Sequence, residues 1–319
     1  MAEIDVLMPN YNGAKFLEES LLSLVNQTFR DWRLIFVDDG STDNSLELAQ
    51  RVIPASKLFV VEAKENHGIS HALNIGIQHL NGRFLARMDA DDVCMEDRFM
   101  SQISLLHSRN DLNAVGSPIQ KIDNFGNAMH QSYSYRSLNS QEVKLLLSIT
   151  NVISHPTTFF RSESLIKIDF CQTQAEDYFA WLSNHNELKW QITDYPLIKW
   201  RKHSLNLSNT KYQSDDDFKI YRKQILEQNN LVISDYLLKF LNCEIDLTDP
   251  TLQSEVVQFK REFLSYSSRK EFKIAACYAF DSLILHNFRS SSYRVKFKKL
   301  RNLQRRSFLH RLFSVLKDT

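Results

Sequence analysis

Hydrophobic and polar positions follow two different patterns along residues 1 to about 125. Short runs rich in Ile, Val, Leu and Phe, typical of strands buried on both faces, occur at residues 4–8, 33–37, 58–62 and 83–88. Apolar residues recur with helical spacing over residues 16–26, 45–51, 70–80 and 95–108. This alternation predicts an α/β fold with a mostly parallel sheet that is flanked by helices.

The last hundred residues show helical spacing without a further strand pattern. Apolar residues recur at helical intervals over residues 215–230 and 252–285. We therefore expect a C-terminal α-helical extension over residues 215–319.

Composition is that of an ordinary globular chain, with 319 residues of which 43% are hydrophobic. The chain starts with neither a basic leader nor a long apolar segment, so secretion and membrane spanning are not expected. The cysteines are too widely separated to indicate a disulfide framework or a zinc site: Cys94, Cys171, Cys243 and Cys277. A reducing cytoplasm fits this composition.

The formal charge of +1 conceals a basic C-terminal segment. Residues 288–319 contain ten Lys or Arg and one acidic residue, Asp318, so this segment carries +9 and the remainder −8. Its apolar residues recur at intervals of three and four, which predicts basic amphipathic helices suited to an anionic membrane surface. The alternative is that their apolar side packs on the protein itself. Nucleic acid is not an expected partner, because no known nucleic-acid-binding motif accompanies the charge.

Polar clusters follow three of the four predicted strands, at residues 9–13, 38–43 and 89–92. The carboxyl ends of parallel strands share one rim of a sheet, where ligands bind. Asp89, Asp91 and Asp92 place three carboxylates in four residues, which indicates a hard divalent cation such as Mn²⁺ or Mg²⁺. The alternative is that Asp91 and Asp92 cap the helix expected from about residue 95.

A nucleotide diphosphate would match the chemistry of this rim. It needs a flat partner for its base, an acceptor for a base N–H and a cation on its phosphates, and Tyr11, Asp39 and Asp91 could supply these in order. Each residue also has a structural explanation, as a packed ring, a turn residue or a helix cap. Three complementary clusters on one rim favour a ligand site.

The order and spacing of several motifs resemble those of a known enzyme family. They are Met8-Pro9-Asn10-Tyr11-Asn12, residues 27–43, 66–74 and 86–92, Ala175-Glu176-Asp177-Tyr178 and Lys199-Trp200-Arg201-Lys202-His203. In these the chain resembles the family 2 glycosyltransferases of GT-A fold, including those that build bacterial surface polysaccharides and lipopolysaccharides. The resemblance implies a GT-A catalytic domain over residues 1–214, with a nucleotide-sugar half at 1–125 and an acceptor half at 126–214.

The resemblance also implies roles for individual residues. Tyr11 and Asp39 would hold the base, and Asp89 the ribose or the metal. Asp91 would bind Mn²⁺ or Mg²⁺ on the diphosphate, with His203 as a further metal or diphosphate contact. The nucleotide-sugar-binding set comprises Pro9, Tyr11, Asp38, Asp39, Asn66, Asp89 and Ala90. Glu176 and His155 would lie on the acceptor side.

Inverting transfer needs a general base. An acceptor hydroxyl attacks C1 of the sugar while the nucleotide diphosphate leaves from the opposite face, so a carboxylate must take the hydroxyl proton. Asp177 is our candidate for this base. Glu176 would point about 100° away on a helix, which suits it to orient an acceptor hydroxyl. The alternatives are that Asp177 only stabilises a helix N-terminus and that His203 is a structural histidine.

We therefore expect a metal-dependent inverting glycosyltransferase. It would move a hexose or N-acetylhexosamine from a nucleotide sugar, expected to be a UDP-sugar, to a hydroxyl of a glycan or lipid-linked glycan in bacterial polysaccharide assembly. We expect it in the cytoplasm, with peripheral attachment to the inner face of the cytoplasmic membrane left open. Nucleotidyl transfer would need a glycine-rich basic loop, which residues 9–13 do not supply. A non-catalytic sugar-nucleotide-binding subunit is the other alternative, and the intact Asp91 and Asp177 argue against it.

Overall fold

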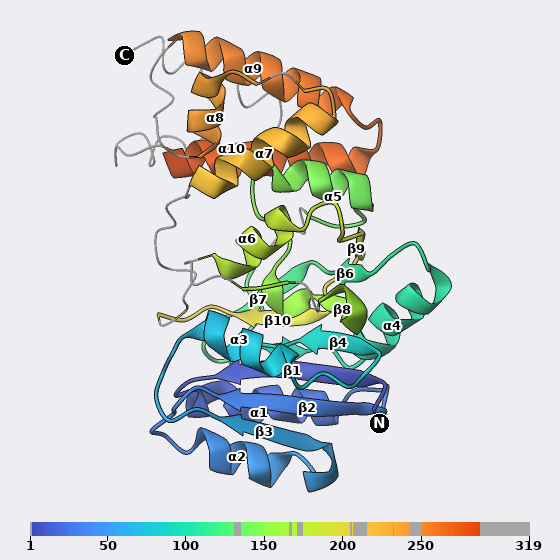
Figure 1. Cartoon of the computed structure of the whole chain (residues 1–319), viewed down its shortest axis with the longest axis vertical. Coiled ribbons are helices and arrows are strands. Elements are labelled where there is room, and N and C mark those ends of the chain that lie inside the picture. The colour runs from blue at the N-terminus through green and yellow to red at the C-terminus, as the bar shows by residue number, and fades with distance from the viewer. Residues whose placement is uncertain are drawn as a thin grey trace. The chain divides into compact units, whose positions relative to one another are not determined.

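The computed structural model describes residues 2–130, 135–165, 168–170, 175–204, 206, 216–231, 233–242 and 250–287 (Figure 1). The chain divides into two compact units, Met1–Leu147 with Asn151–Tyr212, and Ser148–Thr150 with Gln213–Thr319. The basic segment 288–319, for which we predict amphipathic helices, lies outside the described residues.

A seven-stranded sheet forms the centre of the first unit, in the order β3-β2-β1-β4-β8-β6-β9. Its strands are β1 (Ile4–Asn10), β2 (Trp32–Asp38), β3 (Leu58–Glu62), β4 (Phe84–Arg87), β6 (Ala114–Gly116), β8 (Phe159–Arg161) and β9 (Trp190–Ile192). β1 pairs in parallel with β2 and β4, and β2 pairs in parallel with β3, whereas β8 runs antiparallel to both of its neighbours. The predicted mostly parallel α/β sheet is confirmed.

Helices cover both faces of this sheet. Leu17 of α1 (Ala14–Val25) and Phe99 of α4 (Arg98–Ser108) share a buried apolar cluster with Phe84 of β4. Strand residues alternate between faces, and Leu7 lies outside that cluster, against Gly76 of α3 (Ile69–Ile77). The other helices of this unit are α2 (Ser45–Val52), α5 (Ser140–Leu147) and α6 (Glu176–Ser183).

Two elements differ from the sequence prediction. β3 is only partly buried, rather than buried on both faces, because it is the edge strand and pairs on one side. The helix expected from residue 95 begins at Arg98, because Val93–Cys94 forms a short strand, β5. β5 belongs to a second sheet, in the order β5-β10-β7, with β10 (Ile198–Arg201) and β7 (Ile119–Ile122).

The regular secondary structure described in the second unit is all helical, as the sequence predicted. It contains α7 (Asp216–Gln228), α8 (Asp235–Leu241), α9 (Pro250–Ser265) and α10 (Lys270–Asn287). The periodic stretch 252–285 therefore forms two helices, and Phe263 of α9 packs against Phe272 and Phe280 of α10. Among the helices described, none combines the length and apolarity needed to cross a bilayer.

Candidate active site

The loops that follow β1 and β2 are joined by side-chain hydrogen bonds. Asn10 Nδ2 donates to Asp38 Oδ1 at 3.0 Å and to Ser41 Oγ at 3.1 Å. The backbone N–H of Asn12 donates to the same Ser41 hydroxyl at 2.9 Å. Asp38, predicted to bind the nucleotide sugar, is thus buried and shapes this loop, while the Tyr11 ring beside it is 49% exposed.

Asp39 is the next residue after β2, and its carboxylate faces the loop that precedes α3. It accepts hydrogen bonds from the backbone N–H of His67, at 3.1 Å, and of Gly68, at 2.7 Å. His71 Nδ1 lies 3.8 Å from Asp39 Oδ1. Asp39, His67 and His71 line a cavity of about 320 Å³ together with Glu65. A ligand that enters from this edge of the sheet would therefore meet the buried Asp39 carboxylate.

The remaining predicted nucleotide-sugar residues lie around the same rim. Asn66 Oδ1 accepts a hydrogen bond from Gly68 N at 2.9 Å, which fixes the turn before α3. Pro9 is buried in β1, next to its carboxyl end. Ala90 packs against the apolar cluster at the start of the acidic loop.

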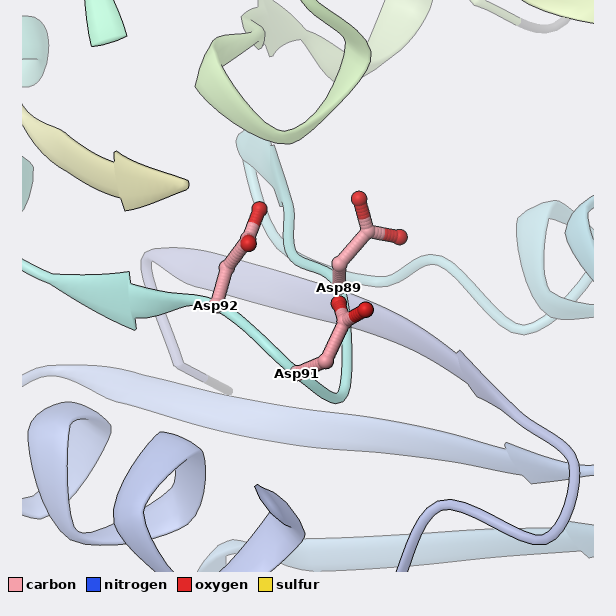
Figure 2. A group of neighbouring side chains, drawn as sticks. All are labelled: Asp89, Asp91 and Asp92. Atoms are coloured by element: carbon pink, nitrogen blue, oxygen red, sulfur yellow. The ribbon is translucent and has the colours of Figure 1, made fainter. Parts of the chain in front are cut away.

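The acidic loop after β4 brings three carboxylates together (Figure 2). Asp89, Asp91 and Asp92 offer oxygen atoms that all lie within 4.8 Å of one another. Asp92 is fully buried: its Oδ1 accepts from the backbone N–H of Arg201 at 2.9 Å, and its Oδ2 has no hydrogen-bond partner among the described residues. The suggestion that Asp91 and Asp92 cap the next helix is wrong, because α4 begins at Arg98 and Asp97 is its N-cap residue.

β10 brings His203 to this loop from more than 100 residues away. His203 Nε2 lies 2.7 Å from Asp91 Oδ2. The neighbouring Arg201 side chain is buried, and its Nε donates to the backbone carbonyl of Asp91 at 2.9 Å. The loop and the segment 201–203 are therefore held together by both main-chain and side-chain hydrogen bonds.

The electrostatics of the loop favour a bound cation. Burial, and then the charge of Asp89, raise the pKa of Asp91, although His203 opposes this. Burial, followed by the charges of Asp89 and Asp91, raises the pKa of Asp92 well above its usual value. Clustered carboxylates that repel one another in this way suit Mn²⁺ or Mg²⁺, which prefer oxygen ligands. The unpartnered Asp92 Oδ2 gives the site a further oxygen, so the residues present fit such an ion.

A second pair of carboxylates begins α6, and the two residues titrate differently. Burial, and then the charge of Glu176, raise the pKa of Asp177 to about 7. Asp177 Oδ2 accepts a hydrogen bond from Asn151 Nδ2 at 3.0 Å. A carboxylate with a pKa near neutrality is well matched to accept a proton from a hydroxyl.

Glu176 is paired with His155. Their Oε1 and Nδ1 atoms lie 3.3 Å apart, and the imidazole is buried between Phe170 and Trp181, with ring centroids 5.2 and 5.4 Å away. Burial alone would raise the pKa of Glu176, but His155 and the charge of Arg87 lower it. The two residues predicted on the acceptor side are thus in contact, and Glu176 keeps its negative charge next to Asp177.

Sequence reasoning missed Arg87 and Asn151. Arg87 is the last residue of β4 and forms a buried ion pair with Asp89, and its charge also acts on Glu176. The available signal was a charged residue at the end of an otherwise apolar strand. Asn151 carried no such signal, because it lies in a loop and its contact with Asp177 arises only from the fold.

Comparison with known proteins identifies the family. The model of glycosyl transferase family 2 matches residues 5–169. The bifunctional glycosyltransferase pgtA of Dictyostelium discoideum is 29% identical over 65% of this chain, which spans only 32% of that protein. The amylovoran biosynthesis glycosyltransferase AmsE of Erwinia amylovora is 30% identical, with 56% of this chain and 67% of AmsE covered.

The fold is also similar to that of a solved structure that binds a nucleotide sugar. The structure of S. aureus TarS 1-349 in complex with UDP-GlcNAc matches with a TM-score of 0.58 at 18% identity, covering 88% of this chain and 81% of TarS 1-349. This likeness extends the GT-A resemblance beyond the matched sequence motifs. Because the family model covers more than half of the chain, this protein belongs to glycosyl transferase family 2.

Proposed function

We propose that this chain is a metal-dependent, inverting glycosyltransferase. It moves a hexose or N-acetylhexosamine from a UDP-sugar to a hydroxyl of a glycan or lipid-linked glycan during polysaccharide assembly. One observation carries the proposal: the same unit holds an acidic loop that fits a cation, with His203 beside it, and a carboxylate, Asp177, whose pKa is raised to about 7.

Each part of the site has a task in a single displacement. Asp177 accepts the proton of the acceptor hydroxyl as its oxygen attacks C1, and the sugar–phosphate bond breaks on the opposite face. Glu176, held ionised by His155, orients the acceptor and keeps the pKa of Asp177 high. Asp89, Asp91 and Asp92 would hold Mn²⁺ or Mg²⁺ with His203, and the ion would supply positive charge for the departing diphosphate.

The relatives and the charge of the chain support the donor and acceptor classes. UDP is favoured because TarS 1-349, which has a similar fold, binds UDP-GlcNAc. The cavity at Asp39 and the exposed Tyr11 ring support a nucleotide base on this side of the site. Polysaccharide assembly is favoured because AmsE acts in amylovoran biosynthesis. A lipid-linked acceptor agrees with the +9 charge of residues 288–319, which would attract the protein to the inner face of an anionic membrane.

Metal-dependent hydrolysis of a panel of nucleotide sugars tests this function without knowledge of the acceptor. We expect Mn²⁺-dependent release of UDP from one UDP-sugar, and chelation should abolish it. Asp91→Asn should weaken Mn²⁺-dependent UDP binding in calorimetry by about 10-fold or more, whereas Asp111→Asn, an exposed carboxylate paired with Arg109, should not. Equal UDP binding by Asp91→Asn and wild type in Mn²⁺ would rule out the metal assignment.

A further inference from the structure

Arg87 lies at the carboxyl end of β4 with its backbone fixed on both sides. Its N–H donates to the Thr158 carbonyl at 3.1 Å, and its own carbonyl accepts from Arg98 Nη2 at 2.8 Å. Ala86 belongs to the apolar cluster shared with α1 and α4, so the Arg87 side chain points to the opposite face of the sheet. The guanidinium is only 3% exposed, which makes its position well defined.

The charge of Arg87 acts on two groups of acids from different parts of the chain. Nη1 forms an ion pair with Asp89 Oδ2 in the acidic loop. On the other side, Thr158, whose carbonyl accepts from Arg87 N–H, donates its hydroxyl to the His155 carbonyl at 2.8 Å, and His155 Nδ1 lies 3.3 Å from Glu176 Oε1. Across these contacts the charge of Arg87 lowers the pKa of Glu176 and of Asp177 at the start of α6. Burial alone would lower the pKa of Arg87 itself, but Asp89, then Glu176 and Asp92, raise it. The guanidinium therefore stays charged and is the cation shared by both groups.

We propose that Arg87 is a positioning residue that couples the cation-binding loop to the general-base pair, by fixing the Asp89 carboxylate and by supplying the positive charge that both groups share. This role rests on the proposed function. Burying a charge costs free energy unless the charge is paired. The pairing therefore restrains Arg87 and its acidic partners alike. Arg87 acts through Asp89 and Asp177, without itself touching the reacting atoms.

Removing the charge should have two separate effects. Without Arg87 the Asp89 side chain loses its partner, and loss of a residue that orients a metal ligand typically lowers metal affinity about 10–100-fold. Among the described residues, Asp177 would then face Glu176, which raises its pKa, and the hydrogen bonds from Asn151 and the Tyr178 backbone N–H, which lower it, but no cation. The charge of Arg87 lowers the pKa of Asp177, so without it Asp177 should ionise at higher pH.

Three variants test the proposal: Arg87→Met, Arg87→Lys and, as the matched control, Arg161→Met. Arg161 lies on the adjacent strand β8, and among the described residues its guanidinium donates to the backbone carbonyls of Leu106 and Leu112 and to no carboxylate. Two readouts need no donor sugar: Mn²⁺ affinity by calorimetry, and the ionisation midpoint of Asp177 by carboxyl ¹³C NMR. Thermal melting checks that each variant is folded.

Arg87→Met should bind Mn²⁺ about 10-fold or more weakly and should raise the Asp177 midpoint, whereas Arg161→Met should change neither. Arg87→Lys keeps the charge without the planar fork, so it should retain the Asp177 midpoint while still weakening Mn²⁺ binding.

A folded Arg87→Met with wild-type affinity and midpoint would overturn the proposal. If Arg87→Met does not fold, an Arg87→Lys variant with unchanged Mn²⁺ affinity overturns it instead. Wild-type protein that binds Mn²⁺ but cleaves no nucleotide sugar would contradict the proposed function while leaving the coupling by Arg87 testable.

Discussion

Two adjacent acids, Glu176 and Asp177, illustrate how the site works at the scale of single residues. They begin the same helix, yet the pKa of Glu176 is lowered and that of Asp177 is raised to about 7. Burial favours the neutral form of both acids, but His155, which contacts Glu176, and the charge of Arg87 outweigh it at Glu176, whereas Asp177 also faces the negative charge of Glu176. An acid–base assignment follows from this separation of pKa values, because the group that titrates near neutrality is the one that can exchange protons.

The pH dependence of transfer should report Asp177. The base must be ionised to accept a proton, so the rate should be low below pH 7, half-maximal near pH 7 and level above it. Asp177→Asn should reduce transfer by about 10²–10⁴-fold while Mn²⁺-dependent UDP binding is kept. Steady-state rates across pH 5–9, with calorimetry on the variant, would check both statements. Near-normal turnover by Asp177→Asn would remove it from the mechanism.

The sequence was informative about these residues only where they form local motifs. Asp89, Asp91 and Asp92 could be recognised as a cluster from four residues of sequence. The contact of His203 with Asp91 was expected only from family resemblance, since 112 residues separate them. Arg87 and Asn151 could not be assigned, because their importance depends on which side chains the fold places against them.

At the scale of elements, apolar periodicity predicted where strands and helices occur, but it predicted their burial and their boundaries less well. The alternation of strands with helices predicted that β1, β2, β3 and β4 run parallel to one another, as they do. The partial exposure of β3 does not, because a run of apolar residues looks alike in a central and an edge strand. The separation of α9 from α10 was also missed, because the prediction treats residues 252–285 as one helically spaced stretch, although no apolar residue follows Tyr266 until Phe272.

Gly40 joins two of these elements, the loop after β2 and the loop before α3. Its φ is +75°, and a Cβ added there would lie 2.7 Å from the backbone of Glu65. Gly40→Ala should therefore combine left-handed strain with a backbone clash, for a loss of about 2–5 kcal/mol in the free energy of unfolding, and should weaken UDP binding.

Gly126→Ala is the matched control for this substitution. Gly126 has a similar φ of +82°, but its nearest neighbour is a side-chain atom 3.7 Å away. It should lose only about 1–2 kcal/mol and keep UDP affinity. Urea denaturation and calorimetry compare the two variants. Equal losses in both would show that the contact with the Glu65 backbone is unimportant.

At the scale of the whole molecule, charge is distributed unevenly. Residues 288–319 carry +9 while the remainder carries −8, so only one end of the chain is suited to an anionic surface. Deleting residues 288–319 should abolish sedimentation with anionic liposomes. Raising the salt concentration should weaken binding of the full chain, because screening shortens the range of the attraction. Sedimentation that persists after the deletion, or that salt does not affect, would contradict a charged membrane contact in this segment.

The hydrogen bonds of Arg201 have a consequence for when the protein can become active during synthesis. Arg201 bonds to Asp91 and Asp92 across sequence separations of 110 and 109 residues. Strands β1, β2, β3 and β4 are complete well before this residue is translated. At about 5–20 residues per second, the ribosome needs roughly 5–20 s to add the intervening chain. We expect a nascent chain that can already pair its parallel strands to wait that long before its acidic loop is fixed, so competence for metal-dependent chemistry arises late in translation.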